Sequence, residues 1–250
     1  LVGSEMCIRD RRNSSATISE TVNSLVQQEH DDYEHIIVDS SSTDGTLDLI
    51  SSLSKDEKVL FLQDEKKGIY DALNIGMNAS SGDIICLLHS DDCFFDECVL
   101  NKVNKCFESK NIDVVYGNIK YVSRKDSNRV IRNWICGEHT KEKLKNGWMA
   151  PHVGIFIKRE FIKNNGMQYL SNLRISADYE FILRLFLNKN TRAFYLDDYL
   201  VNMKYGGVSN KSLQNLLIKY KEDIFALRHN KLNPFRGLIM KNLRKIGQFF

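Results

Sequence analysis

The chain has 250 residues, of which 42% are hydrophobic and 27% charged, and its formal net charge is +3. This length and composition are typical of one large globular α/β domain, and they exclude a membrane bundle and a disordered chain. The small net charge gives no support to a nucleic-acid partner, and no apolar run approaches the roughly 18 residues that span a bilayer.

The N-terminal segment, residues 1–12 (LVGSEMCIRDRR), has neither the apolar core nor the cleavage site of a signal peptide. It resembles translated sequencing-adapter sequence, so we predict that it is a non-native segment. A native, irregular arm is the alternative. On the first interpretation, the first strand of the domain is absent before Asn13.

From Ala16 onward, helical and strand patterns alternate. Helices are predicted at 18–26, 46–53, around 71–74 and at 96–107, and strands at 34–39, 58–62, 83–88 and 112–116. Strands that alternate with crossover helices predict a mostly parallel α/β sheet with helices on both faces.

The regular alternation of strand and helix patterns ends in the second half of the chain. Short antiparallel edge strands are predicted at 120–124 and 130–134, further strands at 153–158 and 191–196, and helices at 177–187 and 209–228. The six cysteines include no CxxC pair, which is typical of reduced thiols in a cytoplasmic protein.

Acidic residues follow two of the predicted parallel strands, where open α/β sheets bind their ligands. Asp39 ends the strand at 34–39, and Asp91 and Asp92 follow the apolar strand at 83–88. Adjacent carboxylates repel each other unless a cation or a donor-rich ligand compensates them. Oxygen ligands of this kind suit Mg²⁺ or Mn²⁺ carried in with a diphosphate. A solvated turn is the alternative, and for Asp44 a helix cap is an equally good interpretation.

Four common enzyme signatures are absent from the sequence, namely GxGxxG after a strand, GxxxxGK[ST], HExxH and GxSxG. Their absence argues against a dinucleotide dehydrogenase, a P-loop phosphotransferase, a zinc protease and an α/β-hydrolase. The strand-end acids and the acidic helix start Ala177-Asp178-Tyr179-Glu180 remain to be explained.

Several short runs, in this order and spacing, resemble family-2 glycosyltransferases with the GT-A fold, and within them the branch that builds bacterial O-antigen and similar surface polysaccharides. The runs are VDSSSTDGT (38–46), GIYDALNIG (68–76), SGD (81–83), LHSDD (88–92), PH (151–152), ADYE (177–180) and GGVS (206–209). The resemblance covers residues 13–210, and it implies a Rossmann-like, mostly parallel sheet with a small antiparallel acceptor-side portion.

The resemblance also implies an inverting, metal-dependent transfer of a hexose from a nucleotide-diphosphate sugar, with uridine as the expected nucleotide. Asp92 would ligate a Mn²⁺ or Mg²⁺ ion that bridges the diphosphate, and Asp178 would be the general base. The implied nucleotide-sugar-binding residues are Asp39, Asp44, Asp71, Asn74 and Asp91.

Charge explains this mechanism. A divalent cation stabilises the negative charge that accumulates on the departing diphosphate, and a carboxylate takes the proton of the attacking acceptor hydroxyl. Asp178 falls in the first turn of a predicted helix, where Ser176 can cap and the helix dipole favours the ionised form. Without the resemblance, an acid at this position is interpreted as a helix cap.

Three further residues keep two interpretations each. His152 either lines the acceptor pocket or is a hydrogen-bonded, half-buried histidine. Trp148 either stacks on an acceptor sugar or packs in the core. His89 either adds a polar contact beside Asp91 and Asp92 or packs.

The resemblance divides the chain into a nucleotide-sugar-binding half (13–118), an acceptor and catalytic half (119–210) and C-terminal helices (211–250). The tail at 234–250 mixes Arg236, Lys241 and Arg244 with apolar residues. A basic amphipathic helix of this kind lies on an anionic membrane surface or packs on its own domain. We therefore expect a cytoplasmic enzyme with peripheral membrane contact and a glycan or lipid-linked acceptor.

Two other functions are compatible with the sequence. A sugar nucleotidylyltransferase also holds Mg²⁺ on carboxylates, but it needs a Gly-rich, Arg-containing loop after its first strand. A catalytically degenerate module would bind a nucleotide or a glycan without turnover. The joint presence of Asp39, Asp91, Asp92 and Asp178 favours the transferase.

Overall fold

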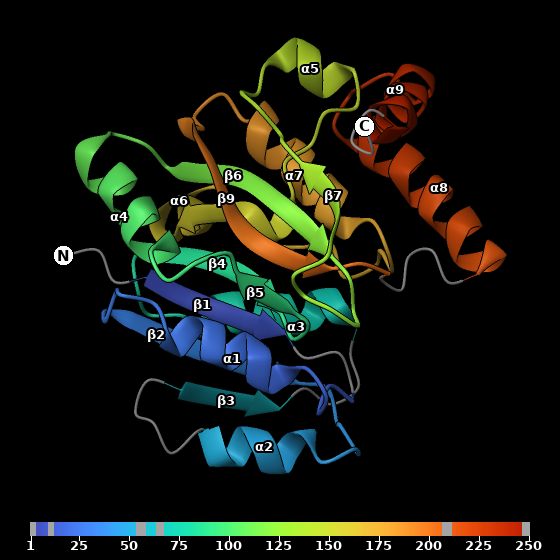
Figure 1. The fold of residues 1–250 in the computed structure, drawn as a ribbon. Helices are drawn as coiled ribbons and strands as arrows, with labels where there is room; N and C mark the ends of the chain where they lie inside the picture. Colours follow the sequence, from blue (N-terminus) through green and yellow to red (C-terminus); the bar gives the residue numbers. More distant parts are fainter. Residues whose placement is uncertain (1–3, 10–12, 54–58, 64–67, 207–211, 247–250) are drawn as a thin grey trace.

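The predicted strands lie in one sheet that crosses the whole molecule (Figure 1). The computed structural model describes residues 4–9, 13–53, 59–63, 68–206 and 212–246. Within them the strand order is β3-β2-β1-β4-β8-β6-β9-β5, with β7 paired to β6. The strands are β1 (Ser4–Arg9), β2 (Tyr33–Asp39), β3 (Val59–Gln63), β4 (Ile84–His89), β5 (Asp92–Phe94), β6 (Val114–Val122), β7 (Val130–Trp134), β8 (Ile155–Lys158) and β9 (Ala193–Lys204).

Helices cover both faces of this sheet, as the sequence predicts. They are α1 (Ile18–Val26), α2 (Thr46–Leu53), α3 (Ile69–Ala79), α4 (Val99–Ser109), α5 (Lys141–Lys145), the 3₁₀ turn η1 (His152–Gly154), α6 (Arg159–Asn164), α7 (Ala177–Leu187), α8 (Leu213–His229) and α9 (Pro234–Ile246). Every residue of β4 is buried, because alternate side chains enter two cores. Ile84 packs with α1 and α4, whereas Ile85 packs with α3, α6 and α7.

The sheet is mixed. Strands β3, β2, β1 and β4 are mutually parallel, whereas β8 runs antiparallel to both β4 and β6. Antiparallel pairs also join β6 to β7 and β5 to β9. The predicted α/β architecture with helices on both faces and an antiparallel portion is therefore confirmed, although the antiparallel portion is larger than expected, since β6 and β9 form the only other parallel pair among the described strands.

The expectation that the first strand is absent is wrong. Ser4–Arg9 forms β1, a parallel strand between β2 and β4. The sequence pattern does not reveal this strand, because the apolar run, Met6-Cys7-Ile8, is shorter than a typical buried strand. The gap between β2 and β4 would otherwise leave two rows of backbone N–H and C=O groups unpaired, and an extended segment satisfies both. The non-native origin of residues 1–12 stays a prediction.

Some predicted boundaries shift for local reasons. The helix expected from Asp96 begins at Val99, because the Asp96 carboxylate accepts the Cys98 N–H at 3.0 Å and forms a turn before the helix. The strands expected at 112–116 and 120–124 are one strand, β6, which runs through the proposed boundary at residue 118. Residues 207–209 of the GGVS run and 209–211 of the predicted long helix lie outside the described residues.

The two C-terminal helices pack against the domain beside α7 (Figure 1). Lys241 on α9 is 5% exposed; its Nζ lies 2.9 Å from the Asp223 Oδ1 of α8 and over the Tyr179 ring of α7. Arg236 and Arg244 hydrogen-bond Asn146, just after α5. Packing on the domain therefore uses the basic residues of the tail. Among the described residues, no helix is both long and apolar enough to cross a membrane.

Candidate active site

The carboxyl ends of β2 and β4 lie at one edge of the sheet, on either side of β1, because Arg9 aligns with both Val38 and His89. Asp39 ends β2 and is fully buried. Its two carboxylate oxygens accept hydrogen bonds from the Ser42 backbone N–H (3.0 Å) and hydroxyl (2.6 Å). Asp39 therefore shapes the loop that follows β2, and its predicted contact with a nucleotide base stays a prediction.

A serine-rich segment after β1 joins the loops beyond β2 and β4. The Asn13 N–H donates to the Ser42 Oγ at 3.0 Å, and the hydroxyls of Ser14 and Ser90 hydrogen-bond at 2.9 Å. The sequence analysis did not single out this segment, since only its polar composition after the undetected strand marked it.

Asp44 has the geometry of a helix cap. Its carboxylate accepts hydrogen bonds from the hydroxyl and N–H of Thr46, the first residue of α2, and from the Ser15 hydroxyl and N–H. These bonds, with that of the Thr46 hydroxyl contributing most, hold the pKa of Asp44 well below its usual value. Of the two interpretations that the sequence left open, the contacts favour the cap, which supports the loop after β2.

Asp91 and Asp92 follow β4 and are both buried. The guanidinium of Arg124, from the β6–β7 turn, contacts the Asp91 carboxylate at 2.6 Å and also donates to the Tyr205 carbonyl. The Asp92 Oδ1 accepts the Lys204 N–H at 3.3 Å. Arg124 thus supplies part of the positive charge that two adjacent carboxylates require. No sequence pattern pointed to this residue.

Asp178 lies in the first turn of α7 and is 27% exposed, so a second substrate can reach it. Its Oδ1 accepts the Tyr179 N–H at 2.7 Å. Its Oδ2 lies 3.7 Å from the Nδ1 of His152, whose Nε2 hydrogen-bonds the Nε2 of His89 at 2.7 Å. His89 ends β4, three residues before Asp92, so the two histidines connect Asp178 to the turn that carries both strand-end acids.

The pKa of Tyr121 is affected by two acidic residues of the site. Its pKa is raised to about 12, first by burial and also by the negative charges of Asp92 and Asp178, while Arg132 acts in the opposite direction. Both carboxylates therefore disfavour ionisation of the same phenol. Burial and these two charges strengthen the preference for the neutral form that an ordinary tyrosine already has at physiological pH.

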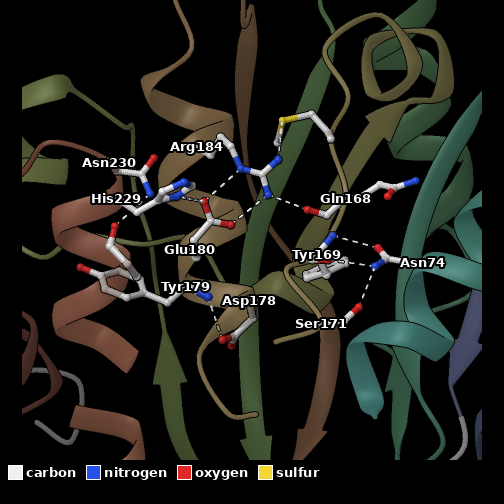
Figure 2. Close-up of polar contacts among 12 residues, drawn as sticks. Asn74, Gln168, Tyr169, Ser171, Asp178, Tyr179, Glu180, Arg184, His229 and Asn230 are labelled. Carbon is white, nitrogen blue, oxygen red and sulfur yellow. Dashed lines mark hydrogen bonds and ion pairs between the residues drawn. The ribbon is translucent and has the colours of Figure 1, made fainter. Parts of the chain in front are cut away.

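The run GIYDALNIG forms α3 and makes mainly structural contacts. The Asp71 carboxylate accepts the Gly68 N–H at 3.1 Å and so caps the helix. The Asn74 amide accepts the Tyr169 N–H at 2.8 Å and donates to the Tyr169 carbonyl at 2.9 Å (Figure 2). Nucleotide contacts of Asp71 and Asn74 stay predictions.

Trp148 is only 4% exposed. Its indole N–H donates to the Cys136 carbonyl at 2.7 Å, and its ring packs edge-on against Tyr116 and Phe186. These contacts favour core packing of the two roles that the sequence left open, because no face of the ring is available to a sugar. His152, by contrast, lies beside Asp178, where a role toward the acceptor remains a prediction.

No group of three or more His, Cys, Asp or Glu residues in the described part of the chain is arranged to hold a metal ion. Mg²⁺ and Mn²⁺ that arrive with a diphosphate need only one or two protein carboxylates, since phosphate oxygens and water supply the other ligands. The buried Asp92 carboxylate fits that smaller requirement, and Asp91 lies beside it.

Comparisons with known proteins bear on the family and the fold. Residues 11–166 match the sequence model described as glycosyl transferase family 2. A "PGL/p-HBAD biosynthesis glycosyltransferase" of Mycobacterium tuberculosis is 27% identical over 211 residues, which cover 83% of this chain and 79% of the relative. The glycosyltransferase AglE of Haloferax volcanii is 25% identical over 159 residues, covering 62% and 52%.

Solved structures resemble the fold. S. aureus TarS in complex with UDP-GlcNAc has a TM-score of 0.72 at 18% identity, covering 95% of this chain and 70% of that one. The mannosyltransferase PcManGT of Pyrobaculum calidifontis, in complex with GDP-Man and Mn²⁺, has a TM-score of 0.64 at 15% identity, covering 95% and 68%.

Proposed function

This chain belongs to glycosyl transferase family 2, and from that premise we propose an inverting transfer of a sugar from a nucleotide-diphosphate sugar to a glycan or lipid-linked acceptor. A UDP-sugar is the proposed donor, because the resemblance in sequence implies uridine and the TarS structures hold UDP and UDP-GlcNAc. The resemblance to the O-antigen branch supports a cytoplasmic role in bacterial surface-polysaccharide biosynthesis.

The observation that carries this proposal is the contact chain from Asp178 through His152 to His89 at the end of β4. It brings a partly exposed carboxylate near the turn of Asp91 and Asp92. In the proposed reaction, Asp178 takes the proton of the acceptor hydroxyl as that oxygen attacks the anomeric carbon, and the sugar–phosphate bond breaks on the opposite face. One displacement of this kind inverts the anomeric centre.

The acids after β4 would act on the donor. Asp91 would contact the ribose or the sugar, and Asp92 would hold a Mn²⁺ or Mg²⁺ ion that binds with the donor. Such an ion offsets the negative charge that develops on the leaving diphosphate. Asp39 and the loop after β2 would bind the base.

The test is donor binding and donor hydrolysis with UDP-, GDP- and dTDP-sugars in the presence and absence of Mn²⁺. We expect Asp92→Ala to lose metal-dependent donor binding, and Asp178→Asn to bind donor normally but to lose turnover by 10²-fold or more, on the order of a general base's contribution. Asp83→Asn, at the opposite end of β4 and exposed, is the matched control.

Two other results would argue against the proposed function. No metal-dependent binding of any donor would contradict the proposed function. Donor binding without turnover in the unmodified protein would favour the degenerate binding module.

We also propose that the C-terminal helices contact an anionic membrane surface. On α9, Phe235, Ile239 and Leu243 recur every four residues and are 78%, 58% and 53% exposed, so they form one apolar stripe. The exposed Arg228 lies in the last turn of α8, and the exposed Lys231 lies in the turn between α8 and α9. Apolar and cationic groups together are the combination by which surface helices bind anionic lipid, and this contact would suit a lipid-linked acceptor.

A further inference from the structure

The segment that leads into α7, residues 168–176, is held from the α3 side. The Asn74 amide exchanges two hydrogen bonds with the backbone of Tyr169 (Figure 2). The Tyr70 hydroxyl donates to the Ile175 carbonyl at 2.7 Å. Both ends of this segment are therefore tied to α3 before the chain reaches Asp178.

The same segment is held from the other side by one carboxylate of α8. Glu222 accepts the N–H groups of three consecutive residues, Arg174, Ile175 and Ser176, at 2.8, 2.7 and 2.8 Å. Ser176 is the N-cap residue of α7, and its own side chain makes no capping hydrogen bond. The side chain of Ser176 therefore does not make the expected cap, and the Glu222 carboxylate instead satisfies the N–H groups at and just before the start of α7.

Three physical effects make the contact between Glu222 and these N–H groups strong. Backbone N–H groups at and before a helix start have no partners within the helix, and hydrogen bonds to a carboxylate are about twice as strong as neutral ones. A negative charge near the start of α7 also interacts favourably with the helix dipole. Asp178 lies two residues after Ser176, close to the backbone that Glu222 holds.

Two further contacts fix α7 against α8 and α9. The fully buried Glu180 receives Arg184 of its own helix, with Nε at 3.0 Å, and the Nδ1 of His229 of α8 at 3.0 Å (Figure 2). Lys241 of α9 lies 3.4 Å from the centre of the Tyr179 ring. The two residues that follow Asp178 are therefore both held by the C-terminal helices.

We propose that Glu222 is a positioning residue for Asp178, which makes the C-terminal helix pair a part of the catalytic machinery. The inference rests on the proposed function, in which Asp178 is the general base. Glu222 touches neither donor nor acceptor in this account. It acts by fixing the backbone from which the base projects.

The experiment compares Glu222→Gln with Lys221→Gln, which removes an exposed charge from the adjacent position of α8. The readouts are UDP release from a UDP-sugar with water as the acceptor, donor affinity by calorimetry, and Tm. We expect kcat to fall by about 10- to 100-fold in Glu222→Gln, on the scale that small misplacements of a catalytic group produce. Donor Kd should stay within twofold, and Lys221→Gln should match the unmodified protein.

Two additional variants separate positioning from folding. In an Asp178→Asn background, Glu222→Gln should cause no further loss of turnover, because the group through which it acts is gone. Tyr70→Phe, which loosens the same segment from the α3 side, should also lower kcat without changing donor Kd.

Three outcomes would overturn an assignment. An unchanged kcat in Glu222→Gln beside an inactive Asp178→Asn would overturn the positioning role alone. A joint fall of kcat, donor affinity and Tm in Glu222→Gln, with unchanged kcat in Tyr70→Phe, would reduce Glu222 to a structural residue. An active Asp178→Asn would instead overturn the proposed base itself.

Discussion

Asp91 and Asp92 are neighbours in sequence but have different surroundings. Asp91 faces the guanidinium of Arg124, whereas Asp92 receives a backbone N–H from Lys204. Arg124 is half-exposed and its partner carboxylate is 7% exposed, so their attraction lies between that of a surface pair and that of a buried pair.

At the residue scale we predict that Arg124→Gln destabilises the metal-free protein by about 1–2 kcal/mol, because the guanidinium that faces a buried carboxylate is lost. Urea unfolding without divalent cations measures this change. Arg129→Gln, an exposed cation of the same turn, should change the free energy of unfolding by less than about 0.5 kcal/mol. Equal effects of the two substitutions would show that the Asp91 contact contributes nothing.

At the scale of elements, hydrogen bonds from α3 hold the segment that leads into α7. The amide of Asn74 hydrogen-bonds both the N–H and the carbonyl of Tyr169, which holds the segment before α7 against the middle of α3 (Figure 2). The family resemblance assigns the same residue to the nucleotide pocket. One substitution distinguishes the two roles.

We predict that Asn74→Ala lowers the free energy of unfolding by about 1–3 kcal/mol, because two partly buried backbone groups lose their partner. Donor Kd, measured by calorimetry with UDP and Mn²⁺, should change by less than threefold. Asn128→Ala, at an exposed asparagine of the β6–β7 turn, is the control. A tenfold loss of donor affinity at unchanged stability would instead place the nucleotide against Asn74.

At the scale of the whole molecule, the C-terminal helices have two faces with different surroundings. The inner face carries Lys241, paired with Asp223 and packed on Tyr179, and cannot meet lipid. The outer face of α9 carries the apolar stripe of Phe235, Ile239 and Leu243. From the sequence, packing on the domain and contact with a membrane were alternatives for this helix. In the structure the inner face packs on the domain while the outer face stays exposed, so the two contacts are compatible.

We predict that the protein floats with vesicles that contain phosphatidylglycerol and much less with pure phosphatidylcholine, since both cationic and apolar groups face outward. The triple substitution Phe235→Ser, Ile239→Ser and Leu243→Ser should abolish flotation while UDP release stays unchanged. Ile135→Ser, which removes an exposed apolar side chain after β7, should bind like the unmodified protein. Undiminished flotation of the triple variant would contradict membrane contact through α9.

The sequence by itself determined the strand–helix alternation, because periodicity records which side chains face a core. It therefore located β4 and α7 to within a residue and put acids at the carboxyl ends of β2 and β4. The sequence did not predict β1, because its three apolar residues carry little periodic signal. The position of β1 follows instead from the backbone hydrogen bonds that β2 and β4 require on their facing edges.

Contacts between residues far apart in the chain were decided only by the tertiary structure. The pairing of His89 with His152, of Arg124 with Asp91 and of Glu222 with the start of α7 spans 33 to 63 positions of sequence. No local sequence pattern encodes such pairs, because each of these polar side chains could equally well be exposed to solvent. Local periodicity thus fixed the elements and their strand-end acids, whereas three-dimensional packing decided which charges compensate those acids and what holds Asp178.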